Sequence, residues 1–419
     1  METIREKKLS PLWRTAAECI IYLFAVVGCL EKIHDLYSLV MVLDGITAVM
    51  AFFFIILWFF LSREFRSNTA SVSLGVLTLV ILVSSIVCSS DVPRLLVALY
   101  SLIESWALGI AVMLLGKKRR RVIAGVYIFI IAFTVFYALF SLLTGIEKGE
   151  VRFSGLSDQT NSLAVVAAST ALICLCLIGE RRNIILTVLS TVLLLAVIAL
   201  SAYTLTKTDS RTSFFALIVA LCFFLVLTFL FFRERFQLIL AVLISLLLIA
   251  GVVAFLLSGS SHSEGSLTLA SLTSGRTTIW GETLSRMEAQ EYLFGFGGNS
   301  EAMKTALEAR GIPASIGEYL WEKHLMHNIY LQFLVEYGIV SAAAFICGSF
   351  YLFSRALAIM RRHRSSRFLL IPSAVLLLFF FVHSLAESSI YFIGGEEQFL
   401  FILSASVIYS YYRREEKEK

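Results

Sequence analysis

His327 and Asn328 stand where a long polar segment meets a long apolar one. The polar segment covers about residues 258–326, and the apolar segment begins with the sequence HNIYLQFLVEYG. A histidine titrates near neutral pH, so its imidazole can take a proton from a hydroxyl group. His327 is therefore a candidate general base beside a membrane. The alternative is a structural role, in which His327 and Asn328 cap the helix that follows.

Three arginines lie in short polar motifs that adjoin apolar segments or the same long polar segment. Arg152 is in VRFSGLSDQTN, Arg211 is in TDSRTS and Arg276 is in SGRTTIW. A guanidinium binds phosphate oxygens through two parallel hydrogen bonds and stays charged at any relevant pH. Two or three such groups meeting beside a bilayer would suit the pyrophosphate of a lipid. Alternatively, each arginine by itself reaches the lipid headgroups.

The composition places these residues in a membrane protein. The chain has 419 residues, of which 58% are hydrophobic and 16% are charged, and its mean hydropathy is +0.85. Ordinary soluble domains are about 45–50% apolar. A segment that spans a bilayer must satisfy its own backbone hydrogen bonds. We therefore predict an all-α fold, a polytopic bundle of transmembrane helices.

Apolar runs long enough to cross a bilayer recur along the chain, since about 20 helical residues suffice. One integral membrane domain is expected over residues 1–419, with 258–326 as a long extracytoplasmic loop. The twelve predicted spans are 16–31, 37–61, 70–89, 94–115, 122–144, 161–178, 184–202, 212–232, 237–257, 328–353, 368–387 and 398–412.

The distribution of basic residues predicts the orientation of these spans. Twelve spans put both termini on one side, and the loops on that side contain 24 of the 35 lysine and arginine residues. Loops rich in lysine and arginine remain in the cytoplasm. Both termini are therefore expected to be cytoplasmic, and His327 and the three arginines should face outward.

The long loop has features of local structure. Trp280, Leu284 and Met287 are spaced for one face of an amphipathic helix within 277–293. A second helix is predicted from Ser300 to Arg310, and Gly311 and Pro313 would end it. The glycines Gly295, Gly297 and Gly298 between these two helices indicate a tight turn. Structureless loops of this length are uncommon, so the loop is expected to be functional.

The cysteines and the acidic residues give weaker indications of function. All seven cysteines lie in or at the ends of apolar runs, so neither a disulfide framework nor a thiolate metal site is expected. No outward cluster has the spacing of metal ligands. Asp44, Glu104 and Glu387 are acidic residues within predicted spans. Such residues are functional candidates, although hydrogen bonding between helices is an equal alternative.

Taken together, these motifs resemble the O-antigen ligase and O-antigen polymerase superfamily of bacterial envelope glycosyltransferases. His327 and Asn328, followed after nine residues by Gly338, match the ligase signature, and Ser341 stands where the signature has Gly, Thr or Tyr. The motifs around Arg276, Arg211 and Arg152 are also similar. The resemblance covers about residues 150–350.

The resemblance implies glycosyl transfer at the outer face of the bacterial inner membrane. The donor would be an undecaprenyl-pyrophosphate-linked glycan, the acceptor a hydroxyl of a glycan or a lipid-linked sugar, and no metal or cofactor would be needed. It implies that Arg211 and Arg276 bind the pyrophosphate and that His327 activates the acceptor. Arg152 and Asn328 are expected to bind substrate. A chain-length regulator is a further expected partner, and nucleic acid is not.

Ser341 favours a polymerase of O-antigen, capsular or exopolysaccharide repeat units over a ligase that transfers the glycan to lipid A-core. A third alternative is a flippase for lipid-linked sugars. Transporters carry broken or charged helices near the middle of the membrane and do not need a structured outer loop. The few charges within the predicted spans therefore favour an enzyme.

Overall fold

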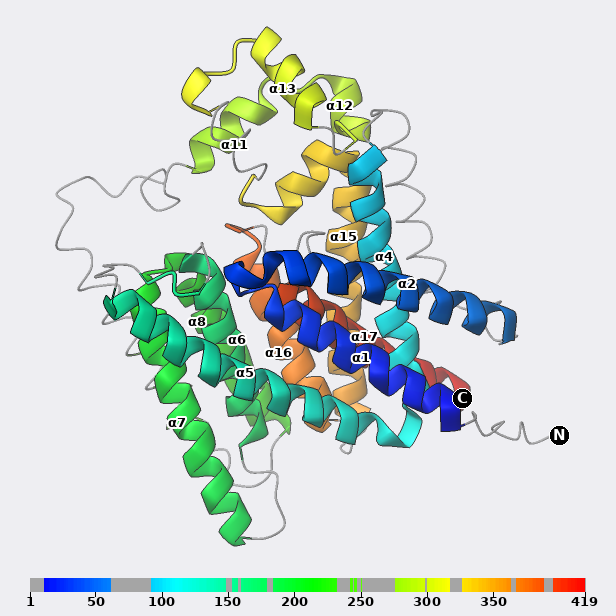
Figure 1. Cartoon of the computed structure of the whole chain (residues 1–419), viewed down its shortest axis with the longest axis vertical. Helices are drawn as coiled ribbons and strands as arrows, with labels where there is room; N and C mark the ends of the chain where they lie inside the picture. The colour runs from blue at the N-terminus through cyan, green and yellow to red at the C-terminus, as the bar shows by residue number, and fades with distance from the viewer. Residues whose placement is uncertain are drawn as a thin grey trace.

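The computed structural model is all-helical over the residues it describes (Figure 1). Those residues are 11–61, 92–147, 153–156, 160–178, 184–231, 242–243, 245–246, 250, 276–297, 300–316, 326–362, 367–387 and 395–418. No strand occurs in these ranges. The predicted all-α class is therefore confirmed.

Long apolar helices form the body of the molecule, with two short 3-10 turns, η1 (His34–Leu36) and η3 (Gly116–Lys118), between them. Seven helices in the described ranges are long and apolar enough to cross a membrane, and α4 and α16 contain shorter apolar helices. The long helices are α1 (Pro11–Leu30), α2 (Tyr37–Leu61), α4 (Val92–Leu114), α5 (Arg119–Glu147), α6 (Thr160–Leu177), α7 (Ile184–Thr208), α8 (Arg211–Phe231), α15 (Ile329–Arg362), α16 (Arg367–His383) and α17 (Gly395–Glu418).

Two predicted spans are not among these helices. The span at 70–89 lies outside the described residues, and the span at 237–257 lies almost wholly outside them. The other predicted spans each overlap one long helix. The agreement follows from the length of the apolar runs, because a run that must bury its backbone polar groups in lipid forms a helix along its whole length.

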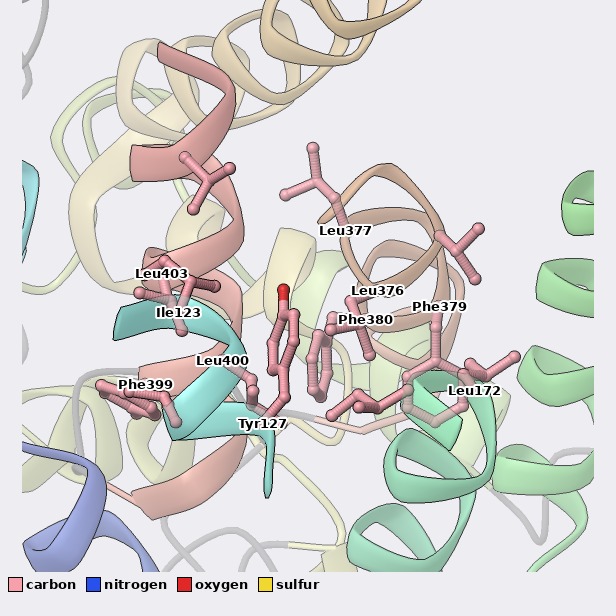
Figure 2. Close-up of a cluster of buried hydrophobic side chains, with 14 of the residues drawn as sticks. Ile123, Tyr127, Leu172, Leu376, Leu377, Phe379, Phe380, Phe399, Leu400 and Leu403 are labelled. Atoms are coloured by element: carbon pink, nitrogen blue, oxygen red, sulfur yellow. The ribbon is translucent and has the colours of Figure 1, made fainter. Parts of the chain in front are cut away.

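The centre of the bundle is formed by α6 and α16, which are buried along most of their length. α16 packs against α8, α17 and α6. Figure 2 shows Tyr127 of α5 among leucine and phenylalanine side chains of α16 and α17. In contrast, α7 exposes Val188, Leu189 and Leu193. An exposed apolar face on a spanning helix is the face that lipid would cover.

The described part of the long loop forms three short helices, α11 (Arg276–Leu284), α12 (Ala289–Phe294) and α13 (Ser300–Ala309). They lie together at the top of Figure 1. Their apolar residues form a small cluster that is separate from the core of the bundle. This small cluster includes Val335 of α15. The described part of the long loop is therefore a compact structure that rests on the start of α15.

The single helix predicted over 277–293 is wrong, because two helices occupy that range. Residues 285–288 leave the helix, and Glu288 takes an extended backbone and begins α12. Glu288 and Glu291 form a reciprocal capping box, which satisfies backbone N–H groups that would otherwise need a preceding turn. The predicted second helix and its end are confirmed, with Gly311 in the left-handed conformation after α13.

Gly295 and Gly338 allow α12 to dock directly on the backbone of α15. Gly338 has φ 79° and ψ 177° and interrupts α15 with a kink. A side chain at Gly338 would overlap the carbonyl of Leu293, and one at Gly295 would overlap Glu336. The backbone N–H of Phe296 donates to the carbonyl of Val335 at 2.8 Å. Only glycine permits so close an approach with positive φ, which gives Gly338, the glycine of the signature, a structural role.

Candidate functional site

His327 is held at a fixed position just before α15. Its φ is 48°, a left-handed conformation that is uncommon outside glycine. The preceding residue, Met326, is held on both sides: its N–H donates to Gln332 Oε1 at 2.6 Å, and its carbonyl accepts from Trp280 Nε1 at 2.7 Å. Such a conformation persists only where the surroundings fix it, and it is common at functional sites.

Asn328 is the cap of α15. Its Oδ1 accepts from the N–H groups of Tyr330 and Leu331 at 3.0 and 3.1 Å, and its Nδ2 donates to the carbonyl of Leu385 at 2.9 Å. These bonds satisfy the first N–H groups of the helix, as an asparagine cap does. Asn328 therefore caps the helix, which is the structural role considered above for this junction, and its side-chain hydrogen bonds are made to the protein backbone.

Glu387, which follows α16, joins the candidate residues. Its Oε2 accepts from His327 Nδ1 at 2.8 Å, and its Oε1 accepts from Arg276 Nη2 at 2.7 Å. Arg276 also donates to the carbonyl of Ala386, and Asn161 Nδ2 donates to Glu387 Oε1 at 2.6 Å. We name Glu387, His327, Arg276 and Asn161 the carboxylate cluster. It unites the long loop with the starts of α6 and α15 and the end of α16.

The cluster is mostly shielded from solvent but not closed. The side chains of His327, Arg276 and Glu387 are 17%, 14% and 9% exposed. Burial raises the pKa of Glu387, but the hydrogen bond with His327 and the positive charge of Arg276 lower the pKa more. The net pKa lies below the ordinary carboxyl value. Glu387 is therefore a carboxylate at neutral pH.

The charge of Glu387 fixes the tautomer of His327. A carboxylate only accepts hydrogen bonds, so the hydrogen between the two side chains belongs to Nδ1 of His327. In a neutral imidazole the other nitrogen, Nε2, then carries the lone pair. This is the arrangement in which a carboxylate orients a histidine and stabilises its protonated form. His327 can therefore act as a base through Nε2.

Arg211, the first residue of α8, lies in a neighbouring but different setting. It is exposed. Two residues later the hydroxyl of Ser213 contacts His383 Nε2 at 3.1 Å, and His383 is the last residue of α16. The start of α8 is thus anchored to His383, which precedes Glu387 by four residues. Arg152 lies outside the described residues.

The structure therefore brings His327, Asn328 and Arg276 together and anchors the start of α8, with Arg211, beside the end of α16. Sequence reasoning assigned no partner to Glu387 and missed Asn161 and His383. Asn161 lies in the motif RFSGLSDQTNSLA, and Glu387 was a candidate because acids are rare in spans. The described residues contain no group of three or more His, Cys, Asp or Glu side chains that could hold a metal.

Comparison with known proteins agrees with the resemblance. Residues 196–346 match the family described as O-Antigen ligase, which supports membership of the O-antigen ligase and polymerase superfamily. No curated protein matches the chain. Together with the seven apolar helices, this match indicates an enzyme of the bacterial inner membrane with glycosyltransferase-like activity on a lipid-linked glycan and an acceptor. The matched segment contains Arg211, Arg276 and His327.

Proposed function

We propose that the protein transfers a glycan from undecaprenyl pyrophosphate to an acceptor hydroxyl at the outer face of the membrane, and that it polymerises repeat units of an envelope polysaccharide. The observation that supports this most is Glu387, whose carboxylate holds His327 on one oxygen and Arg276 on the other. A base and an anion-binding group are thereby fixed side by side.

In the proposed reaction, His327 Nε2 takes the proton of the acceptor hydroxyl. The hydroxyl oxygen then attacks the anomeric carbon of the donor glycan, and the bond from that carbon to the pyrophosphate oxygen breaks. Undecaprenyl pyrophosphate leaves with the bonding electrons, and in-line attack inverts the anomeric configuration. Glu387 stabilises the imidazolium that forms on His327. General base catalysis of this kind contributes about 10²- to 10⁴-fold.

Arg276 and Arg211 would stabilise the negative charge that develops on the pyrophosphate. The bonds from Arg276 to Glu387 and to the carbonyl of Ala386 use two of the five N–H groups of a guanidinium. The other N–H groups of Arg276 can face a phosphate, and the guanidinium is already oriented before the substrate binds. Preorganised charge in a site shielded from water stabilises a transition state strongly. Arg211 is exposed and would add a second contact. Arg152, outside the described residues, is proposed to bind substrate as well.

Two acceptors fit this chemistry. Ser341 occupies the last place of the signature, and its hydroxyl donates to the carbonyl of Tyr337 at 3.0 Å inside α15. We propose a polymerase, in which the acceptor is another lipid-linked repeat unit and a chain-length regulator is a partner. The description of the matched family favours the second candidate, a ligase that passes the finished glycan to lipid A-core or another acceptor.

The test is gel analysis of surface and lipid-linked glycans in a deletion strain complemented with wild type, His327→Ala or Arg276→Ala. Both variants should be present at wild-type level and should lack long-chain glycan. Single repeat units on the final acceptor, without a ladder, would identify a polymerase. Full-length polymer retained on undecaprenyl pyrophosphate would identify a ligase.

Two results would contradict the proposal. Normal chain length in both variants would exclude His327 and Arg276 from the chemistry. Accumulation of single lipid-linked repeat units on the cytoplasmic face of the membrane would instead identify a flippase.

A further inference from the structure

A second buried polar cluster lies where α1 ends and α17 begins. Lys32 forms an ion pair with Glu397, and the two side chains are 9% and 4% exposed. The hydroxyl of Tyr137 donates to the backbone carbonyl of Lys32 at 3.2 Å. Burial disfavours the charged form of Lys32, but Glu397 outweighs burial, so the pKa of Lys32 lies above its ordinary value. Lys32 is therefore a fixed positive charge.

Acidic side chains crowd around this lysine. Gly395 leaves room for them: a Cβ there would lie 3.3 Å from Glu397 Oε2, 3.4 Å from Glu31 Oε2 and 3.8 Å from Lys32 Nζ. Glu396 is fully buried, and within the described part of the chain neither of its oxygens has a hydrogen-bond partner. Within this group, Glu397 forms the ion pair with Lys32. We name Lys32, Glu31, Glu396 and Glu397 the lysine cluster.

The lysine cluster and the carboxylate cluster meet at the first turn of α6. Lys32 Nζ donates to Ser162 Oγ at 3.4 Å, and the adjacent residue, Asn161, donates to Glu387 Oε1 at 2.6 Å. Neighbouring side chains on a helix point about 100° apart. The first turn of α6 is thus held from two directions, and the side chain of Asn161 bears directly on the carboxylate that orients His327.

We propose that Lys32 is a positioning residue, which acts through Ser162 and Asn161 to hold Glu387 in the orientation that His327 requires. This inference rests on the proposed function for its kinetic consequence but not for its geometry. It assigns a role to the TNS sequence of the α6 motif, which the reaction itself does not use. Lys32 lies 130 residues from Ser162, and Asn161 lies 226 residues from Glu387, so the link exists only in the folded protein.

The kinetic test uses purified protein in nanodiscs and, as donor, the undecaprenyl-pyrophosphate-linked glycan that accumulates in the deletion strain. Release of undecaprenyl pyrophosphate is measured. The variants are Asn161→Ala, the paired change Lys32→Met with Glu397→Gln, and all three changes together. The paired change leaves no unpartnered charge at Glu397. Both Asn161→Ala and the paired change should lower kcat by roughly 10- to 100-fold, the range for a small misplacement of a reacting group, with little change in KM.

The combined variant distinguishes positioning from general damage. If Lys32 acts through Asn161, the triple change should lose no more activity than Asn161→Ala alone, because residues in one network are not additive. The acidic limb of the pH–rate profile should move equally in all three variants. Ser169→Ala is the control: this buried hydroxyl lies further along α6, outside both clusters, and donates to the carbonyl of Val166, so the change should keep kcat within about twofold of wild type. Multiplied losses, or an equal loss in Ser169→Ala, would overturn the proposal.

A second measurement keeps this inference separate from the proposed function. Diethyl pyrocarbonate modifies neutral histidines, and mass spectrometry can follow His327 alone. Loosening Glu387 should change the rate of modification of His327 by the same factor in Asn161→Ala and in the paired change. Equal rates in wild type and both variants would refute the positioning role. Wild-type protein that releases no undecaprenyl pyrophosphate would instead refute the proposed function.

Discussion

The starts of α11 and α8 look alike in sequence and differ in structure. Each helix begins with an arginine that follows a serine or glycine and precedes a threonine. Arg276 at the start of α11 is 14% exposed and bound to Glu387. Arg211 at the start of α8 is exposed. One arginine is already oriented by the protein, whereas the other can turn toward a ligand.

The neighbouring contacts explain this difference. α11 is fixed to the bundle by Trp280, which donates to the carbonyl of Met326 beside His327. α8 is anchored through Ser213, and its first side chain is left outside the packed core. We infer that Arg276 contributes preorganised charge and that Arg211 contributes a contact formed when substrate binds. The following predictions test that distinction.

Glu387→Gln should have the largest effect. The amide keeps the shape of the side chain but removes the charge that holds Arg276 and fixes Nδ1–H of His327. Loss of an orienting carboxylate and of preorganised charge should lower kcat by about 10²- to 10³-fold. Release of undecaprenyl pyrophosphate from purified protein measures it. Activity within a few fold of wild type would mean that Glu387 serves only the fold.

The matched lysine substitutions separate the two arginines directly. Lysine keeps the charge but loses the planar fork that binds two acceptors at once. Arg276→Lys should therefore lower kcat by about 10²-fold, the size of one lost oxyanion contact. Arg211→Lys should mainly raise KM, by about tenfold or less, because lysine keeps the charge of this exposed contact but not its two parallel hydrogen bonds. Equal losses in kcat would remove the distinction between the two sites.

Gly338→Ala tests whether close backbone contact between α12 and α15 stabilises the docked loop that carries Arg276. The added methyl group would overlap the carbonyl of Leu293 at a position with positive φ. Overpacking of this kind costs about 1–3 kcal/mol. The purified variant should unfold at a lower temperature. Gly348→Ala in the same helix is the control, because nothing lies within 4 Å of its added methyl group, and it should not lower the unfolding temperature.

The smallest effect concerns pH. The pKa of Glu387 is lower in the folded protein than its ordinary value. Its ionisation therefore stabilises the fold above the ordinary carboxyl pKa of about 4.3, and this contribution is lost as pH falls through the folded pKa. Unfolding temperatures measured between pH 7 and pH 3 should fall more steeply in wild type than in Glu387→Gln. Arg211→Ala should follow wild type, since Arg211 has no part in that ion pair.

The sequence could predict the helices well and the site only in part. Apolar length alone determined α2, whose predicted and observed bounds are both 37–61. The spacing of apolar residues gave a wrong prediction within 277–293. It continues a helical face through Met287, whereas the backbone leaves the helix at 285–288. That turn depends on a capping interaction between Glu288 and Glu291, which the spacing of apolar residues does not report.

The site depended on contacts that no local pattern contains. His327 and Glu387 are 60 residues apart, and Arg276 and Glu387 are 111 residues apart. Residue type selected His327 and Arg276 as candidates, because few side chains in the polar segments can take a proton or bind a phosphate. Their meeting point could not be identified, because it depends on how α16 packs against the starts of α6 and α15. Glu387 became interpretable only through those contacts.

The most direct test of the central claim is a double-mutant comparison of His327 and Glu387 in the release of undecaprenyl pyrophosphate by purified protein. Because Glu387 orients His327 and also holds Arg276, the double variant His327→Ala with Glu387→Gln should lose more activity than His327→Ala alone but much less than the product of the two single losses. Any residual activity should then depend on the arginines. A double variant whose loss equals the product of the two single losses would show that Glu387 and His327 act independently and would contradict the account.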